Sequence, residues 1–250
     1  MAKLMRKTVI LVAGGKGVRM GGDLPKQFIP VDGKPILMHT AEVFYQWDSL
    51  AGLFIVIPED HAGYWQMLCK ELNFNIPHRL VFGGETRFHS VRNALQAIEN
   101  AGTHIIGGID SCNVDDVGLL ADPGSALIAV HDGVRPYVST EVITACFHAA
   151  EKYGAAIPVT PMIESVREIT GAENRPFDRT RLRIVQTPQV FRADILQKAY
   201  KQPYNERFTD DASVVETFGQ KIHLVEGAPE NIKITTIDQL KTKNLKNNSC

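Results

Sequence analysis

A glycine-rich stretch that carries three cationic side chains is the part of this sequence best suited to chemistry. The segment LVAGGKGVRMGGDLPKQF begins at Leu11, directly after the apolar run TVIL, and includes Arg19 and Lys26. Glycines allow backbone N–H groups to approach phosphate oxygens closely, and Pro25 restricts the backbone just before Lys26, which helps to aim that side chain. The stretch is therefore suited to a triphosphate, with Arg19 and Lys26 supplying full positive charge.

The glycine-rich stretch admits three other interpretations. Taken alone, G-G-x-G fits a tight strand-to-helix turn with solvated lysines better than it fits a binding site. A P-loop would need G-x-x-x-x-G-K-[ST], but Lys16 is followed by Gly17. A Rossmann fingerprint begins at Gly15 and Gly17, but Met20 stands where the third glycine belongs. The longer ordered pattern, G-G-x-G-x-R-M followed by P-K-Q, is more specific and is typical of nucleotidyltransferases that activate sugars or polyol phosphates.

The elements that must position this stretch are indicated by short apolar runs that alternate with helical patterns. Runs of this length and composition predict strands that are buried on both faces of a sheet. The four runs are TVILVAG from Thr8, LFIVIP from Leu53, RLVFGG from Arg79 and ALIAVHD from Ala126. The N-terminal run also resembles a weak signal peptide, but it is short and leads into GGKGVRM, so a buried first strand explains it better.

Two helices are expected between these strands. Over residues 86–100, apolar side chains follow the i, i+3, i+4, i+7 spacing of one buried face: Val91, Ala94, Leu95 and Ile98. The segment 139–154 opens with Ser139 or Thr140 as an N-cap and closes on Gly154 as a C-cap. Strands that alternate with helices predict an α/β fold, with a mostly parallel sheet and helices on both faces.

Sheets of this kind bind ligands at the carboxyl ends of their strands. The glycine-rich stretch, FGGETR from Phe82 and VHDGVRP from Val130 each follow an expected strand. These three loops are therefore expected to converge on one cleft. We expect a single domain over 1–240 and a solvated tail over 241–250.

Composition limits the classes of function. The chain has 250 residues, a formal net charge of −1, 44% hydrophobic and 22% charged residues, which is ordinary for a globular domain. There is no basic excess that would indicate nucleic-acid binding, and no segment is long enough to cross a membrane. Four well-separated cysteines lack zinc spacing, so reduced and mostly buried thiols in a cytoplasmic protein are expected.

Two regions break the alternation of strands and helices. Residues 107–124 are acidic and glycine-rich without a clear period, and we expect a surface loop or insertion there. Residues 164–191 instead predict a β-hairpin arm, with two extended runs around the turn TGAENRP. The protruding part is expected over about 164–187. An arm that cannot bury itself within its own chain usually packs on another subunit, so a homodimer is expected.

Several ordered segments together resemble one nucleotidyltransferase family. FGGETRFHSV, VHDGVRP, FDRTRLRIVQTPQVF, FTDDAS and ENIKIT follow the glycine-rich stretch in that order. From about Thr8 to Leu240, the sequence resembles the 2-C-methyl-D-erythritol 4-phosphate cytidylyltransferases of the non-mevalonate isoprenoid pathway. The resemblance implies a Rossmann-like fold, CTP as co-substrate, Mg²⁺ as cofactor and a homodimer whose arms embrace. It also implies that a phosphate monoester attacks the α-phosphorus of CTP and expels pyrophosphate.

The resemblance implies a nucleotide site around the glycine-rich stretch. Arg19 and Lys26 would hold the triphosphate and stabilise the transition state, and Lys233 in ENIKIT would bridge the two substrates. Asp132 would hold Mg²⁺ or a substrate hydroxyl. The residues implied to bind the nucleotide, its cytosine included, are Ala13, Gly14, Gly15, Gly17, Gly83, Gly84, Ser90, Asp132 and Gly133.

A second set is implied to bind the acceptor, a polyol phosphate. It comprises Asp132, Arg135, Ser165 and Thr187, together with Arg179 as a further catalytic cation, and some of these residues would reach across the dimer. Because the attacking phosphate is already an anion at neutral pH, the implied reaction requires no Ser/His/Asp relay. Its demand is electrostatic, since two polyanions must meet, and fixed cations with a metal ion satisfy it.

Three of these positions also have plain structural interpretations. Arg135 could be a surface cation that pairs with Asp132, and Ser90 could be a solvated helix residue. His131 is expected to be a structural histidine. The choice between these interpretations and a binding site depends on the ordered set of motifs and not on any one residue.

Two further groups have similar alternatives. Arg179, Arg181 and Arg183 alternate along an expected strand, so they could form one solvated face. Asp210 and Asp211 could charge a helix N-terminus, or they could orient the site from behind.

Two rival functions remain at this point. Ribitol-5-phosphate cytidylyltransferases look much alike through GGKGxRMG and PKQF, although DRTRLRIVQTPQ favours the methylerythritol phosphate family. A catalytically silent module that binds nucleotide belongs to another functional class, and the presence of Arg19, Lys26 and Lys233 argues against it.

Overall fold

The computed structural model describes residues 5–14, 24–100, 126–236 and 239. Three positions of the implied nucleotide site, Gly15, Gly17 and Arg19, lie outside the described residues. The expected insertion over 107–124 and the expected tail over 241–250 lie outside them as well. Among the described cysteines, Cys69 and Cys146 are free thiols. No helix within the described part is both long and apolar enough to cross a membrane.

Within the described residues, eight strands form one mixed sheet in the order β10-β7-β11-β6-β1-β4-β5, and β12 pairs with β7. β1 pairs in parallel with β4 and β6, and β4 with β5, whereas β10 and β11 run antiparallel to their neighbours. The expectation of a mostly parallel sheet is confirmed. The strands are β1 Arg6–Val12, β4 Gly52–Ile57, β5 Arg79–Phe82, β6 Ala126–Asp132, β7 Ala155–Pro161, β10 Arg183–Val185, β11 Gln189–Arg192 and β12 His223–Glu226.

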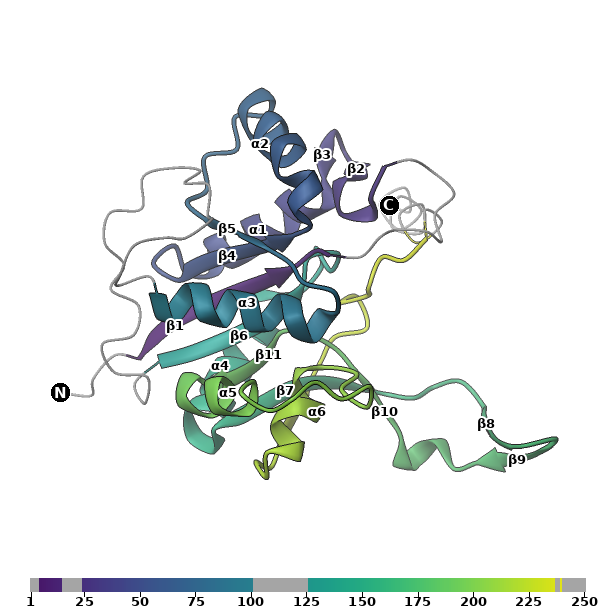
Figure 1. Ribbon diagram of the computed structural model, residues 1–250. Helices are drawn as coiled ribbons and strands as arrows, with labels where there is room; N and C mark the ends of the chain where they lie inside the picture. Colours follow the sequence, from purple (N-terminus) through teal and green to yellow (C-terminus); the bar gives the residue numbers. More distant parts are fainter. Residues whose placement is uncertain (1–4, 15–23, 101–125, 237–238, 240–250) are drawn as a thin grey trace.

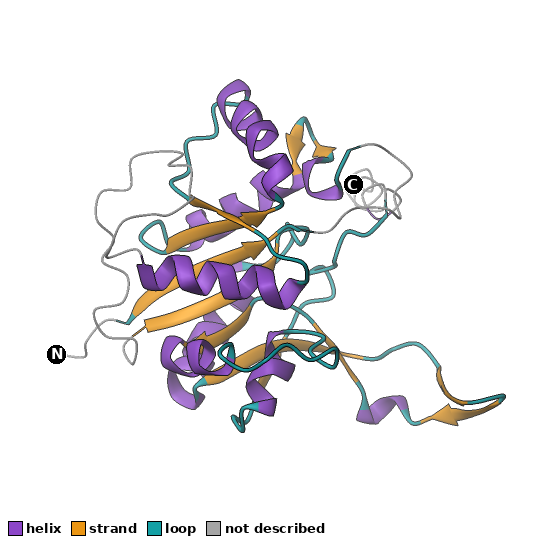
Figure 2. Ribbon diagram, viewed as in Figure 1, coloured by secondary structure: helices purple, strands orange, loops and turns teal. Residues whose placement is uncertain are grey.

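Helices cover both faces of this sheet (Figures 1 and 2). Successive strand side chains point to opposite faces, so Val9 of β1 packs on one set of helices and Ile10 on the other. One layer contains α1 Ile36–Trp47, α2 Ala62–Glu71 and α4 Thr140–Tyr153, and the other contains α3 Arg87–Asn100, α5 Ala193–Ala199 and α6 Asp211–Thr217. The α/β layering predicted from the alternation of elements is therefore confirmed.

The two helices expected from sequence are both present. In α3 the residues at the predicted apolar spacing, Val91, Ala94, Leu95 and Ile98, are all buried. In α4 the Ser139 hydroxyl accepts a hydrogen bond from the backbone N–H of Val142 at 3.3 Å, which settles the N-cap on Ser139. Gly154 ends α4 in the left-handed conformation with φ 88°, which favours glycine.

The arm is a hairpin, but it is shorter than expected. β8 Val166–Thr170 pairs antiparallel with β9 Glu173–Phe177, and the hairpin projects away from the body of the molecule (Figure 1). Because Thr170 is paired with Glu173, the turn consists of residues 171–172, and residues 173–176 of the predicted turn belong to a strand instead. The return strand β10 already lies in the main sheet against β7, so residues 183–187 are not part of the protrusion.

The expected strand through three arginines is wrong for two of them. Arg179–Arg181 forms a 3₁₀ helix, and only Arg183 lies in a strand. The cause is local, because the Asp178 carboxylate accepts hydrogen bonds from both the backbone N–H and the hydroxyl of Thr180. Such side-chain bonds offer the backbone an alternative to a sheet ladder.

Candidate active site

A cleft of about 210 Å³ lies at the carboxyl ends of β1 and β6 and beside the loop that follows β5. The expectation that these three loops converge is therefore confirmed for the described residues. A fourth segment, from the C-terminal part of the chain, contributes Lys233. The lining residues are 12–14, 26–27, 84–87, Ser90, Asp132, Val134 and Lys233.

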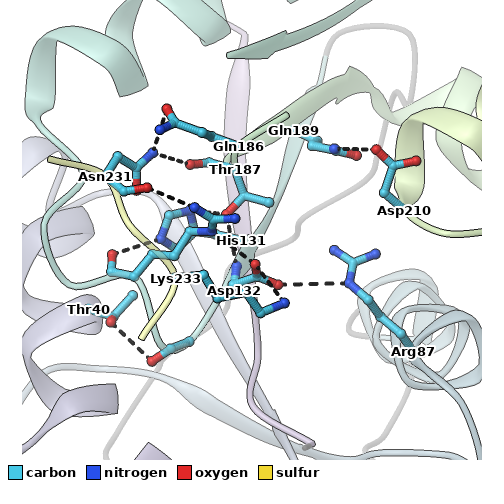
Figure 3. Close-up of polar contacts among 12 residues, drawn as sticks. Thr40, Arg87, His131, Asp132, Gln186, Thr187, Gln189, Asp210, Asn231 and Lys233 are labelled. Atoms are coloured by element: carbon cyan, nitrogen blue, oxygen red, sulfur yellow. Dashed lines mark hydrogen bonds and ion pairs between the residues drawn. The ribbon is translucent and has the colours of Figure 1, made fainter. Parts of the chain in front are cut away.

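Asp132, the last residue of β6, is the centre of the cleft's electrostatics. Its Oδ2 lies 3.0 Å from Arg135 Nε and 3.1 Å from Lys233 Nζ, and its Oδ1 lies 3.9 Å from Arg87 Nε. Figure 3 shows the carboxylate between Lys233 and Arg87. Burial alone would raise the pKa of Asp132, but Arg87, Lys233 and Arg135 together hold that pKa well below its usual range. The three cations therefore favour the ionised form of this carboxylate.

Arg87 is a cleft residue that the sequence analysis did not single out. It is the first residue of α3, and its Nη2 lies 2.6 Å from Oδ2 of Asp211. Asp211 is fully buried and also accepts a hydrogen bond from the Tyr200 hydroxyl at 2.6 Å. The arginine of FGGETR, placed directly after an expected strand end, was the signal that could have indicated this role.

Asp210 and Asp211 have different roles. The Asp210 carboxylate caps α6 by accepting from the backbone N–H of Ser213 at 2.9 Å, so the helix-terminus interpretation is confirmed for Asp210. Asp211, in the first turn of α6, pairs with Arg87, which lines the cleft, and its role in orienting the site from behind stays a prediction.

Thr187 and His131 support Asp132 from inside the sheet. The Thr187 hydroxyl accepts from the backbone N–H of Asp132 at 3.1 Å and donates to His131 Nδ1 at 2.9 Å. His131 Nε2 then donates to the carbonyl of Arg135 at 3.2 Å, so a neutral ring carries its hydrogen on Nε2. Burial lowers the pKa of His131 to about 4. His131 is thus structural, as expected, and the Thr187 hydroxyl is engaged inside the protein and not on the cleft surface.

A set of amide hydrogen bonds holds the segment that carries Lys233. Asn231 Nδ2 donates to the carbonyl of Thr187 at 2.8 Å (Figure 3). Gln186 Nε2 donates to the carbonyl of Ala228 at 2.7 Å. Arg135 Nη1 donates to the carbonyl of Asn231 at 2.7 Å. Sequence analysis singled out neither Gln186 nor Asn231, although both lie inside the quoted motifs QTPQ and ENIKIT.

The loop after β5 forms the wall implied to recognise cytosine. Ser90 is 3% exposed, and its hydroxyl accepts from the backbone N–H of Gly84 at 3.1 Å and donates to the carbonyl of Thr86 at 3.0 Å. Ser90 is therefore not a solvated helix residue. A Cβ on Gly84 would lie 2.5 Å from His89 Cβ, and one on Gly83 would lie 3.0 Å from Ser90 Oγ. The wall is close-packed, and Gly84 and Ser90 line the cleft.

A second part of the cleft lining comes from the end of β1 and from the 3₁₀ helix Lys26–Phe28. Ala13, Gly14 and Lys26 line the cleft. Gln27 lines it too, with its side chain buried and both amide atoms without a hydrogen-bond partner among the described residues. Gly133 lies behind this wall, where a Cβ would come within 3.0 Å of the Ala13 side chain.

Two residues of the implied acceptor site are not brought into the cleft of their own chain. Ser165 and Arg179 are both exposed, and neither lines the cleft. Arg179 donates a hydrogen bond to the carbonyl of Ile163 at the base of the arm. Arg135, by contrast, lies beside the cleft and is paired with Asp132, as the structural interpretation proposed. Its side chain is only 11% exposed, so Arg135 is not a surface cation.

The acids of the cleft limit how a metal ion can be held. No group of three or more His, Cys, Asp or Glu side chains gathers within the described residues. Asp132 and Glu85 are the carboxylates that line the described cleft. Mg²⁺ is commonly bound by one or two carboxylates plus substrate phosphates. The residues present therefore fit a Mg²⁺ ion held mainly by a bound nucleotide.

Comparisons with known proteins agree on one family. A family model described as 2-C-methyl-D-erythritol 4-phosphate cytidylyltransferase matches residues 7–110 and 105–245. The protein of that name from Bacteroides thetaiotaomicron is 47% identical over 237 residues, which cover 95% of this chain and 97% of the relative. The one from Porphyromonas gingivalis is 46% identical over 232 residues, covering 92% and 93%.

Solved structures give the same result. The fold is similar to 4-diphosphocytidyl-2C-methyl-D-erythritol synthase from Anaerococcus prevotii, with a TM-score of 0.73 and 25% identity, covering 97% of this chain and 96% of that one. It is also similar to 2-C-methyl-D-erythritol 4-phosphate cytidylyltransferase from Francisella tularensis, with a TM-score of 0.68 and 30% identity, covering 96% and 99%.

Proposed function

The chain belongs to the 2-C-methyl-D-erythritol 4-phosphate cytidylyltransferase family, and we propose that the cleft around Asp132 is its active site. The enzyme transfers CMP from CTP to 2-C-methyl-D-erythritol 4-phosphate and releases pyrophosphate, a step of isoprenoid precursor biosynthesis. One observation carries the placement of the site. Cations from separate segments of the chain, Lys26, Arg87 and Lys233, line one cleft around a single buried carboxylate.

The chemistry of the transfer explains why cations are gathered there. A phosphate oxygen of the acceptor attacks the α-phosphorus of CTP, the bond to the bridging oxygen breaks, and pyrophosphate leaves with the electron pair. Charge is spread over the equatorial and leaving oxygens during this step, and preorganised cations stabilise it. We assign Lys26 to the triphosphate and Lys233 to the position between the two substrates. Arg19 is proposed for the triphosphate on sequence alone.

The nucleotide subsite is proposed between the two glycine-containing walls. Ala13 and Gly14 present backbone to the phosphates and ribose, and the sequence places Gly15 and Gly17 with them. Gly84 and Ser90 face the base, with Gly83 allowing the close packing behind them. Gly133 contributes shape, because it permits the loop after β6 to approach Ala13.

The acceptor subsite is proposed on the Asp132 side of the cleft. Arg135 is the cation beside that part of the cleft, and Thr187 acts by holding the Asp132 backbone. Ser165 and Arg179 lie on the arm, so we propose that they act in the cleft of a partner subunit. The arm and its base expose the apolar side chains of Ile163, Ile169, Ile184 and Val185, which supports a homodimer.

Mg²⁺ is proposed as the cofactor, with Asp132 as the main protein carboxylate and Glu85 nearby. When bound, the ion neutralises charge on the triphosphate. The protein's own part is to keep Asp132 ionised, because its three cations lower the pKa of that carboxyl. A cytoplasmic location is proposed from the free thiols and the ordinary composition.

The choice of acceptor tests the function. Methylerythritol phosphate carries a methyl branch on a main chain one carbon shorter than that of ribitol phosphate, so the shape of the site and not its charge must separate them. We expect kcat/KM with CTP to favour methylerythritol phosphate by at least roughly 100-fold, the scale that pocket contacts can supply. The measurement is pyrophosphate release with each acceptor at equal CTP and Mg²⁺. Equal rates, or faster turnover of ribitol phosphate, would contradict the assignment, and no turnover with either would favour a silent module.

A further inference from the structure

The three cations around Asp132 differ in what else holds them. Arg135 also donates to the backbone carbonyl of Asn231, and its side chain is 11% exposed. Arg87 is also paired with the buried Asp211. Within the described residues, Lys233 makes its ion pair with Asp132 alone, and its side chain is 41% exposed. Two of the cations are therefore held at two points, and the third at one.

This difference determines which cation can turn toward a substrate. A lysine carries a compact charge on a flexible stem, whereas an arginine held at two points is confined by its planar fork. Lys233 can leave Asp132 for a phosphate without breaking another ion pair of the described structure. Arg87 would also have to break its ion pair with Asp211, and Arg135 would have to break its hydrogen bond to the carbonyl of Asn231.

If Lys233 leaves, the Asp132 carboxylate still needs compensation. Asp132 is 7% exposed, and a buried carboxylate without a partner is strongly destabilising. Lys233 shares Oδ2 with Arg135, so that oxygen keeps a cation after Lys233 has moved. The cation at Oδ1 is Arg87. The two arginines therefore hold the carboxylate through its two different oxygens.

Arg87 itself is anchored from behind the cleft. Asp211, in the first turn of α6, accepts from both Arg87 and the Tyr200 hydroxyl, each at 2.6 Å. The Tyr200 ring is buried and stacked on Phe88, with ring centroids 4.8 Å apart and an interplanar angle of 18°. This packing fixes the position of the Asp211 carboxylate and therefore of the guanidinium group.

We propose that Arg87 is a positioning residue of the transfer reaction. It holds Asp132 in place and compensates its charge, so that Lys233 can exchange its ion pair with Asp132 for one with a substrate phosphate. The inference rests on the proposed function of the same site. Without Arg87, Oδ1 loses its cation, the carboxylate retains Lys233 more strongly, and its orientation depends on Arg135 alone.

The test compares Arg87→Gln and Arg87→Lys with the unaltered enzyme in the steady-state pyrophosphate assay. We expect Arg87→Gln to lower kcat on the order of 10²-fold, the effect of losing one preorganised charge, with less than about threefold change in KM for CTP. Arg87→Lys should recover about tenfold of that loss, because it keeps the charge but not the fork. Arg92→Gln, on the same helix and outside the cleft, is the matched control and should keep normal turnover.

A double-mutant cycle separates this role from a merely structural one. In a Lys233→Ala background, Arg87→Gln should lower kcat by less than about threefold, because Lys233, through which Arg87 acts, is already absent. Additive losses in the double mutant would overturn the proposal. So would a large rise in KM for CTP at unchanged kcat, since it would place Arg87 directly on the nucleotide.

Two milder variants keep the test valid if Arg87→Gln does not fold. Asp211→Asn and Tyr200→Phe loosen the anchor without removing the cation, and each should lower kcat in the same direction and more weakly. Normal kcat in both folded variants would overturn the anchored role. An unaltered enzyme that does not turn over CTP with methylerythritol phosphate would refute the proposed function instead, so the two failures are distinguishable.

Discussion

The Thr187 hydroxyl donates to Nδ1 of His131 at 2.9 Å, beside a cleft from which this histidine is fully buried. The same hydroxyl accepts from the backbone N–H of Asp132 at 3.1 Å, so Thr187 links the histidine to the cleft carboxylate's backbone. Burial lowers the pKa of His131 to about 4, so the folded protein resists protonation there.

The first prediction is that His131 makes folding stability fall with acid. Between pH 6.5 and 4 the unfolded chain binds a proton at this histidine and the folded protein does not, so stability decreases as pH falls through that window. From pH 7 to pH 5 the loss should be about 2 kcal/mol in free energy of unfolding. Urea titrations at both pH values measure it.

The matched variants for this prediction are His131→Gln and His148→Gln. His148 is exposed on α4, so its replacement should leave the pH dependence unchanged. His131→Gln should remove about 2 kcal/mol of the difference between pH 7 and pH 5. A His131→Gln protein whose stability changes with pH just as in the unaltered chain would show that this histidine is not responsible.

The second prediction concerns Lys26. Lys26→Ala should fold normally and lose on the order of 10²-fold or more in kcat, because a preorganised charge that faces the triphosphate is removed. Lys70→Ala, at an exposed position of α2, serves as the control and should retain full turnover. Circular dichroism establishes folding, and pyrophosphate release establishes the rate. Near-normal turnover by a folded Lys26→Ala protein would remove Lys26 from the proposed mechanism.

The third prediction is that the protein forms a dimer through its arm. Ile163 and Ile169 are 72% and 69% exposed within one chain, and a two-fold partner would cover them. Sedimentation at micromolar concentration should give twice the chain mass of 27.7 kDa. Ile169→Glu should shift the protein toward monomer and reduce turnover, because Ser165 and Arg179 would no longer reach a partner cleft. Leu50→Glu, far more exposed but outside the arm, is the control. A fully active monomer would contradict the prediction.

The local pattern of residue types was sufficient to predict the structure wherever the contacts are made by residues close together in the sequence. The parallel strands, the buried face of α3 and the caps of α4 follow from periodicity and from Ser139 and Gly154, because burial and capping act within a few residues. The hairpin arm was also predictable, but its turn was predicted too long. Residues such as Asn174 and Pro176 favour turns in general, and only the pairing of β8 with β9 makes them strand residues.

The sequence by itself determined the family, the chemistry and most of the residues that line the cleft, because ordered motifs preserve the types and spacing that phosphate transfer needs. Tertiary structure alone decided how those residues are held. Arg87 meets Asp211 across 124 positions of the chain, and Asn231 meets Thr187 across 44, separations that no periodicity links. Tertiary structure also decided that Thr187 faces His131 while Ser165 and Arg179 lie on the arm, because the direction of a side chain depends on which surfaces the whole fold brings together.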